Sequence, residues 1–168
     1  MHLEEMLGAV LKNLTVRDAL KDPDHEPAYF IRPKASMREI IEAYGHSDQD
    51  VFPVVDEEGR LHGIIDNRRV RHAIAMASDK ERDRVVASDL MSSAPLLNIN
   101  ETLYSAMRKI VESKRDQLVV VEDGDRTKIR GAISRRDLVA AYDRAVIKYQ
   151  GKDREQDLEA HKDDRVLL

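Results

Sequence analysis

The sequence contains no cysteine among its 168 residues, and this absence removes several kinds of site. Without cysteine the chain has no disulfide framework, no thiolate nucleophile and no cysteine-ligated zinc. Such a composition favours an intracellular setting. The six histidines show no paired spacing typical of metal ligands, so we expect no metal site.

Long apolar runs and a large excess of one charge are also missing. The longest apolar runs, such as residues 118–121, fall far short of the roughly 20 residues that cross a bilayer, and no signal-peptide pattern opens the chain. The net charge of -4 arises from 28 basic and 32 acidic side chains, which leaves no basic face for nucleic acid. There is neither a Walker-type glycine loop nor a recognisable nucleophile with its base. We therefore expect a cytoplasmic, non-enzymatic protein that does not bind nucleic acid.

An internal repeat organises what is present. Residues 36–44 align with residues 102–110 at an offset of 66, and both segments place apolar residues at i, i+3, i+4 and i+7. This spacing predicts two amphipathic helices. Ser36 and Glu39 have the spacing of a capping box at the start of the first helix, and the second is expected to start near Asn100 or Thr102.

Short β-branched runs repeat at the same offset. Residues 52–56 align with residues 118–122, and each run ends in turn residues, which predicts buried strands. A second strand follows each turn and a further helix follows each second strand. The fold class is therefore α/β (α+β), with a β-α-β-β-α unit made twice around a pseudo-twofold axis. Because about 65 residues is near the lower limit for independent folding, we expect each half to bury its sheet against the other.

The repeat also divides the chain. We assign residues 1–13 to an N-terminal lead-in, 14–77 to the first repeat, 78–85 to a charged linker and 86–149 to the second repeat. Residues 150–168 are dense in charge and lack a convincing apolar stripe, which predicts a frayed tail.

Two motifs in the second repeat resemble those of a known family. Residues 89–92 read Asp-Leu-Met-Ser, and residues 131–138 read Gly-Ala-Ile-Ser-Arg-Arg-Asp-Leu. Together with the hairpin at residues 52–65, they resemble a tandem pair of cystathionine-β-synthase (CBS) domains, a Bateman module, over residues 14–149. The resemblance implies two CBS-type repeats, a homodimer, and an adenine nucleotide (ATP, ADP or AMP) bound between the repeats as a regulatory ligand.

The two ends of the chain carry a finer resemblance. Residues 137–146 and the lead-in at residues 2–18 are similar to the cytoplasmic C-terminal region of bacterial CLC-type chloride channels and transporters. This implies an artificial start at Met1 and a membrane channel or transporter domain N-terminal to it, so that the chain is a soluble domain of an inner-membrane protein. A stand-alone soluble partner of another protein is the alternative.

The Ser-x-x-Asp motif of the second repeat supplies the candidate nucleotide site. Gly131 allows close approach of a ligand to the backbone, and Ser134 places a hydroxyl at the positive end of a helix. Asp137 can accept hydrogen bonds from both ribose hydroxyls, and Arg135 or Arg136 can pair with phosphate.

Apolar strand edges are expected to hold the base. The candidates are Ile133, Val51, Phe52 and Leu96. The resemblance also implies that the stretch before the hairpin of the partner repeat, Asp50 and Val51, helps to line the site.

Capping is the competing interpretation of Ser134 and Asp137, since the same spacing is an N-cap arrangement worth about 0.5 to 2 kcal/mol. In the first repeat, Asp66 stands where the serine belongs and Arg69 where the aspartate belongs. Asp66 would repel phosphate and Arg69 cannot accept from a diol, so we predict that this half-site is dead for ribose and that one ligand binds per chain. A surface salt bridge is the alternative role for Arg69.

A module without any ligand is the alternative function. In that case the helices at residues 70–77 and 138–146 serve only to hold two subunits together. Light scattering without a nucleotide-induced change would favour it.

Overall fold

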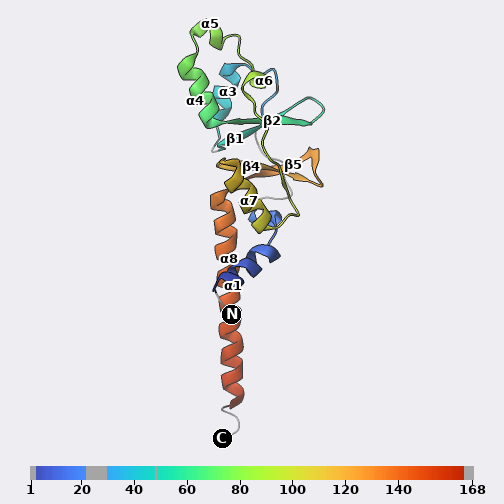
Figure 1. The fold of residues 1–168 in the computed structure, drawn as a ribbon, viewed down its shortest axis with the longest axis vertical. Coiled ribbons are helices and arrows are strands. Elements are labelled where there is room, and N and C mark those ends of the chain that lie inside the picture. Colours follow the sequence, from blue (N-terminus) through green and yellow to red (C-terminus); the bar gives the residue numbers. More distant parts are fainter. Residues whose placement is uncertain (1–2, 22–29, 48, 165–168) are drawn as a thin grey trace.

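The computed structural model describes residues 3–21, 30–47 and 49–164. Two small mixed α and β bodies lie one above the other, and one long helix projects from the lower body (Figure 1). The order of elements confirms the α+β fold class that the sequence predicts.

The first body is built on an antiparallel hairpin. Strand β1 (Val51–Val55) pairs with β2 (Leu61–Asp66), and helices α3 (Met37–Gly45) and α4 (Asn67–Met76) belong to the same repeat. The expected capping box at α3 is confirmed, because the Ser36 N–H donates to Glu39 Oε2 over 2.7 Å and the Glu39 N–H donates to Ser36 Oγ over 3.3 Å. Where the β-α-β-β-α unit begins with a strand, Ile31 makes a single parallel bridge to Val54.

The second body repeats this plan with a three-stranded sheet. Strand β3 (Leu97–Asn98) runs parallel to β4 (Gln117–Glu122), which pairs antiparallel with β5 (Asp125–Ser134). Helix α7 (Leu103–Ser113) precedes β4 and begins after Thr102, whose hydroxyl accepts from the Ser105 N–H. Helix α8 (Arg135–Asp164) follows β5 directly.

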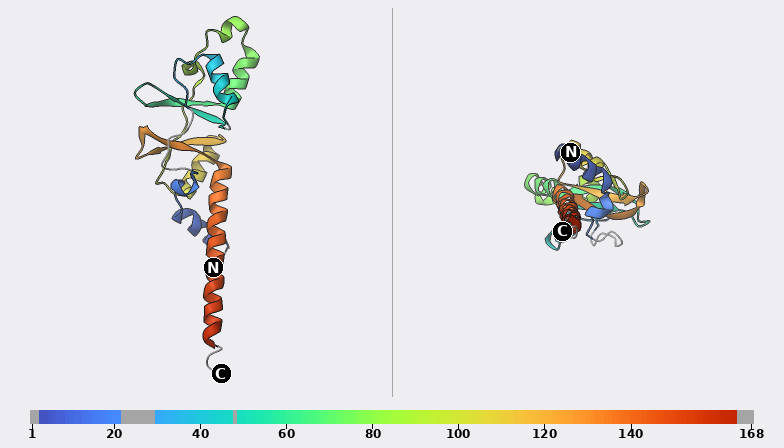
Figure 2. Two further views of the ribbon diagram at one scale, coloured as in Figure 1. Left: turned by 180° about the vertical axis from the view of Figure 1, so that it is seen from behind. Right: turned by 90° about the horizontal axis from the view of Figure 1, so that it is seen from below.

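The two sheets pack against each other between the bodies. Seven buried apolar side chains form this inter-repeat core: Val51, Val55, Leu61, Ile64, Val119, Val121 and Ile129. Both hairpin turns lie on one side of the molecule, and α4 and α8 both start on the opposite side (Figure 2). The expectation that each half buries its sheet against the other is confirmed.

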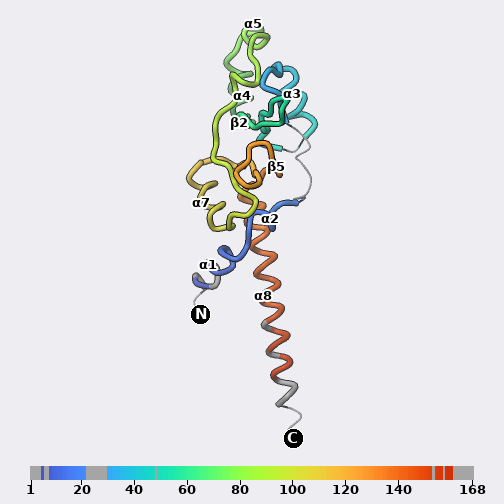
Figure 3. Tube along the Cα trace, turned by 90° about the vertical axis from the view of Figure 1, so that its right-hand side faces the viewer, coloured from blue at the N-terminus to red at the C-terminus, as the bar shows by residue number. Residues whose placement is uncertain are grey.

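Two short helices are exchanged between the bodies. Helix α2 (Val16–Ala19) precedes the first repeat in sequence, but Val16 and Ala19 are buried in the core of the second. Helix α6 (Ala87–Leu90) precedes the second repeat, but Ala87 and Leu90 are buried in the core of the first. The chain from α5 (Asp79–Arg82) through α6 to α7 therefore runs along both bodies (Figure 3).

The lower body is completed by the lead-in. Helix α1 (Leu3–Asn13) packs against α7 and α8. Within the segment expected to be a linker, α5 forms one turn of helix, capped by the Ser78 hydroxyl.

The frayed tail expected at residues 150–168 is not seen in residues 150–164, because α8 continues to Asp164. Lysine, arginine, glutamate and glutamine are good helix formers, and the single Gly151 costs only about 1 kcal/mol. These residues also extend a helix that is already nucleated. Residues 165–168 lie outside the described residues. No helix in the described part of the chain has the length and apolar character needed to cross a membrane.

Candidate functional site

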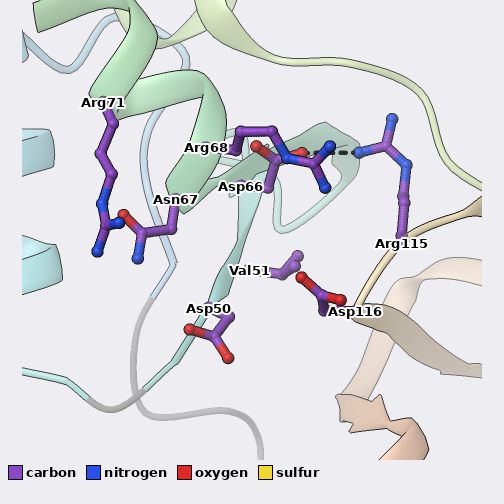
Figure 4. Close-up of a pocket in the computed structure, with 8 residues that line it drawn as sticks. All are labelled: Asp50, Val51, Asp66, Asn67, Arg68, Arg71, Arg115 and Asp116. Carbon is purple, nitrogen blue, oxygen red and sulfur yellow. Dashed lines mark hydrogen bonds and ion pairs between the residues drawn. The ribbon is translucent and has the colours of Figure 1, made fainter.

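A cavity of about 350 Å³ opens where α4 begins and where the chain enters β4. Its size falls in the range of roughly 300–1,000 Å³ typical of small-molecule sites. The first repeat contributes Asp50, Val51, Asp66, Asn67, Arg68 and Arg71, and the second contributes Arg115 and Asp116 (Figure 4). Both repeats are therefore needed to form it.

Backbone contacts bring the first repeat's residues together. Val51 and Asp66 are partners in the β1–β2 register, and the Asn67 N–H donates to the Asp50 carbonyl over 3.1 Å. Asp66 also caps α4, because its Oδ1 accepts from the Arg69 N–H over 2.8 Å. The end of β2, the start of α4 and the chain before β1 thus meet at one point.

Arg115 joins the second repeat to this point. Its Nη1 lies 3.0 Å from Asp66 Oδ2, which forms an ion pair at the cavity wall (Figure 4). Its Nη2 donates to Ser92 Oγ over 3.1 Å and to the Ser93 carbonyl over 3.3 Å.

The cavity separates groups of opposite charge. Arg68 and Arg71 are exposed on the first turns of α4, where the helix dipole adds positive potential. Asp50 and Asp116 are exposed below them in the view of Figure 4. The arginines suit an anionic group, and the carboxylates suit hydroxyl donors.

Tyr44 lies close enough to two carboxylates of the cavity, Asp66 and Asp50, to be affected by their charge. Its hydroxyl donates to the Ile65 carbonyl over 2.8 Å. Burial raises the pKa of Tyr44 above its ordinary value, and the carboxylates of Asp66 and Asp50 add to the rise. The tyrosine therefore remains a neutral hydrogen-bond donor beside Asp66.

The family described as CBS domain matches residues 16–76 and again residues 87–144, which together make up more than half of the chain. The chain belongs to the CBS-domain family.

Solved structures support a CBS pair at the level of the fold. The CBS domain of a bacterial CNNM/CorC family Mg²⁺ transporter, in complex with ATP, has a TM-score of 0.66 at 13% identity and covers 84% of this chain and 97% of that one. CBSX2 in complex with AMP has a TM-score of 0.63 at 22% identity and covers 82% and 99%. Among curated proteins, the A-adding tRNA nucleotidyltransferase of Aquifex aeolicus (strain VF5) is 24% identical over 142 residues, which is 83% of this chain and 16% of that protein. The chain thus spans about a sixth of that relative's length.

The CBS pair places its sequence-predicted residues in different environments. Asp50 and Val51 line the cavity, but they do so beside Asp66 of their own repeat. Phe52 is 0% exposed and Ile133 is 1% exposed, and they belong to the two separate repeat cores. Their side chains are therefore covered in this structure, and their contact with a base stays a prediction. Each of these two side chains packs among the helices and strands that form the core of its own body.

Ser134 and Asp137 form the helix cap that was the alternative to a role in ligand binding. The Ser134 N–H and hydroxyl donate to Asp137 Oδ2 over 2.9 and 3.0 Å, and the Asp137 N–H donates to Ser134 Oγ over 3.2 Å. Neither residue lines the cavity described above, and Arg135 is exposed at the start of α8. The two half-sites are nevertheless neighbours, because Ser134 pairs with Gln117, which follows Asp116.

Gly131 serves packing in this structure. Its φ is 146°, and a Cβ built on it would lie 3.1 Å from Leu20 Cδ2. The close approach that we expected from a ligand is made instead by the residue that follows α2.

Several cavity residues were not predicted. Asp116 could have been found, because the offset of 66 maps it onto Asp50. Arg68 and Arg71 appear in sequence as ordinary helix surface residues. Arg115 has no local signal, because its partner Asp66 is 49 residues away.

Proposed function

We propose that this CBS pair is a non-enzymatic regulatory module that binds an adenine nucleotide (ATP, ADP or AMP) in the cleft between its repeats. The observation that carries this proposal is the cavity built by both repeats, with Arg68 and Arg71 on one side and Asp50 and Asp116 on the other. Guanidinium groups at a helix start suit phosphate, and carboxylates suit a ribose diol. Complexes of structurally similar CBS domains with ATP and with AMP support the class of ligand.

The cleft offers two half-sites for the nucleotide. At the cavity, Arg68 and Arg71 would take the phosphate and Asp50 or Asp116 the ribose. At the second half-site, Asp137 would take the ribose and Arg135 the phosphate, as the sequence motif suggests. The cavity is the stronger candidate, because Asp137 Oδ2 already accepts two hydrogen bonds from Ser134. This choice replaces the prediction that the half-site of Asp66 and Arg69 is dead, because the cavity offers other carboxylates, Asp50 and Asp116, for the ribose.

Binding would regulate by favouring one arrangement of the two repeats. The shift cannot exceed the difference in the ligand's affinity for the two arrangements. Helix α8 starts at the cleft, and α1 packs against α8. A movement of α8 at the cleft would therefore be transmitted to α1. A homodimer, and a membrane transporter domain of the chloride-channel type joined before α1, are parts of the proposal that rest on the sequence resemblance.

A ligand-free dimerisation module is the second candidate. The reciprocal cap between Ser134 and Asp137 favours it, because the motif has a complete structural role without a ligand. Dimers whose mass and stability do not change with nucleotide would support this candidate.

Thermal unfolding of the full chain with ATP, ADP and AMP tests the proposal. Ligand at about 100 times its dissociation constant adds about 2.7 kcal/mol, which raises the Tm by several degrees. Arg71→Ala should abolish the shift, whereas Arg108→Ala, an exposed helix arginine on α7, should retain it.

A second pair of variants tests the Asp137 half-site. Asp137→Asn should reduce the shift if the ribose binds there. Asp89→Asn is its matched control, because Asp89 accepts from the Val86 N–H over 3.0 Å in an equivalent cap on α6. A wild-type protein whose Tm does not move with any of the three nucleotides contradicts the proposal.

A further inference from the structure

Arg115 ties together three segments that are distant in sequence. Its guanidinium binds Asp66 at the end of β2, and it binds Ser92 and Ser93 on the segment between α6 and β3. Ser92 is itself held to the first sheet by two backbone hydrogen bonds of 2.9 Å with Ile64. The Arg115 and Asp66 side chains are 23% and 28% exposed, so the pair is partly shielded from solvent.

The turn before β4 positions this arginine. Lys114 adopts the left-handed conformation, with φ 56° and ψ 27°, and ends α7. The Ser113 hydroxyl donates to the Ile110 carbonyl and accepts from the Arg115 N–H over 3.2 Å. These hydrogen bonds therefore hold the backbone of Arg115 in place, and its side chain extends from there to the other repeat.

The internal repeat contains a matched change at the equivalent positions. The offset of 66 maps Arg115 onto Gln49, whose N–H donates to Ser47 Oγ over 3.1 Å in the same kind of turn. Asp66 corresponds to Ser134 at an offset of 68, because the hairpin loop of the second repeat is two residues longer. One half-site therefore has the charged pair of arginine and aspartate, and the other has glutamine and serine, which are both neutral.

We propose that Arg115 is a specificity-determining latch: it pairs with Asp66 across the repeats and so allows the cavity to accept an anionic phosphate. The inference rests on the proposed function, because it assigns to Arg115 the neutralisation of Asp66, the acid at the start of α4 beside Arg68, where the proposal places the phosphate. Asp66 alone would repel that phosphate. With Arg115 in place, the Asp66 carboxylate caps α4 while its negative charge is neutralised. The positive charge of Arg68 and Arg71 then dominates the potential at the start of α4.

Four variants of the full chain test the latch: Arg115→Ala, Arg115→Lys, Asp66→Ser, and the double variant that combines Arg115→Ala with Asp66→Ser. Asp66→Ser removes the charge but retains a good N-cap residue for α4. The probes are AMP, adenosine and pyrophosphate, titrated by calorimetry. Adenosine separates recognition of the base and ribose from recognition of the phosphate.

Arg115→Ala should weaken the affinity for AMP and for pyrophosphate by about tenfold or more. It should weaken the affinity for adenosine by less than about threefold. Adding Asp66→Ser to it should restore AMP to within about threefold of the wild type, because the unpaired acid is gone. The affinity of Arg115→Lys for AMP should lie between those of Arg115→Ala and the wild type. An ammonium can pair with Asp66 but cannot present the guanidinium fork to Ser92 as well.

The outcomes separate the latch from the proposed function. If the wild type binds AMP and Asp66→Ser fails to rescue Arg115→Ala, the latch is wrong and the nucleotide module stands. If the wild type binds pyrophosphate but neither AMP nor adenosine, the nucleotide module is wrong, and rescue of pyrophosphate binding decides the latch. If the wild type binds none of the probes, both are wrong.

Discussion

Replacing Gly131 by alanine distinguishes a glycine kept for packing from a glycine kept for ligand approach. The added methyl group would lie 3.1 Å from Leu20 Cδ2, and its backbone would have to hold a φ of 146°. Backbone strain of this kind costs about 1–3 kcal/mol. The far end of Leu20 can move, so the steric contribution is the smaller one.

The loss of stability in Gly131→Ala should lower the Tm by about 2–4 °C for each kcal/mol in a chain of this size, or about 2–12 °C in total. Thermal unfolding followed by circular dichroism measures it. Leu20→Ala in the same chain should relieve the steric part but not the strain, so the double variant should be less destabilised than the sum of the two single changes. Gly45→Ala is the control, because a Cβ at Gly45 has nothing within 4 Å and its φ is ordinary.

A different result would refute this reasoning. If Gly131→Ala keeps the wild-type Tm but loses nucleotide binding, the glycine serves ligand approach, and the packing of Leu20 against it is incidental.

Three further predictions concern the inter-repeat core, the long helix and acid stability. Ile64→Ala should lower the free energy of unfolding by about 2–5 kcal/mol in a denaturant titration, because Ile64 is buried between the two sheets, whereas the exposed Ile147→Ala should change it by less than about 0.5 kcal/mol. Gly151→Ala should raise the helical circular dichroism signal with a gain of up to about 1 kcal/mol in helix propensity, since nothing lies near its Cβ; an unchanged or lower signal would contradict a continuous α8. The hydrogen bond from His62 lowers the pKa of Asp56, so the stability that it contributes is present above the ordinary aspartate pKa and is lost as the pH falls through the depressed value. His62→Ala should therefore flatten the decline of Tm below about pH 4, and a Tm profile parallel to that of the wild type would contradict this role.

The local elements could be read from the sequence because their signals act over a few residues. The apolar spacing of residues 37–44 and 103–110 predicts α3 and α7, and the Ser36–Glu39 box predicts where α3 begins. The β-branched runs predict both hairpins for the same reason. At residues 150–164, high charge suggested a frayed tail, but the same residues have good helix propensity and follow a nucleated helix.

The candidate site could be predicted only in part. Asp50 and Val51 lie in the cavity, and Asp116 follows from the repeat offset. Phe52 and Ile133, predicted as base contacts, have buried side chains, because sequence patterning shows that a residue is apolar but not which neighbours cover it.

By itself, the sequence determined the repeat, its helices and strands, their caps and the Ser134–Asp137 motif, since each depends on residues that are close along the chain. The tertiary structure alone decided that α2 and α6 exchange bodies and that Arg115 meets Asp66. These contacts depend on how two half-domains, each too small to bury its own sheet, pack together, and no short-range pattern encodes that packing.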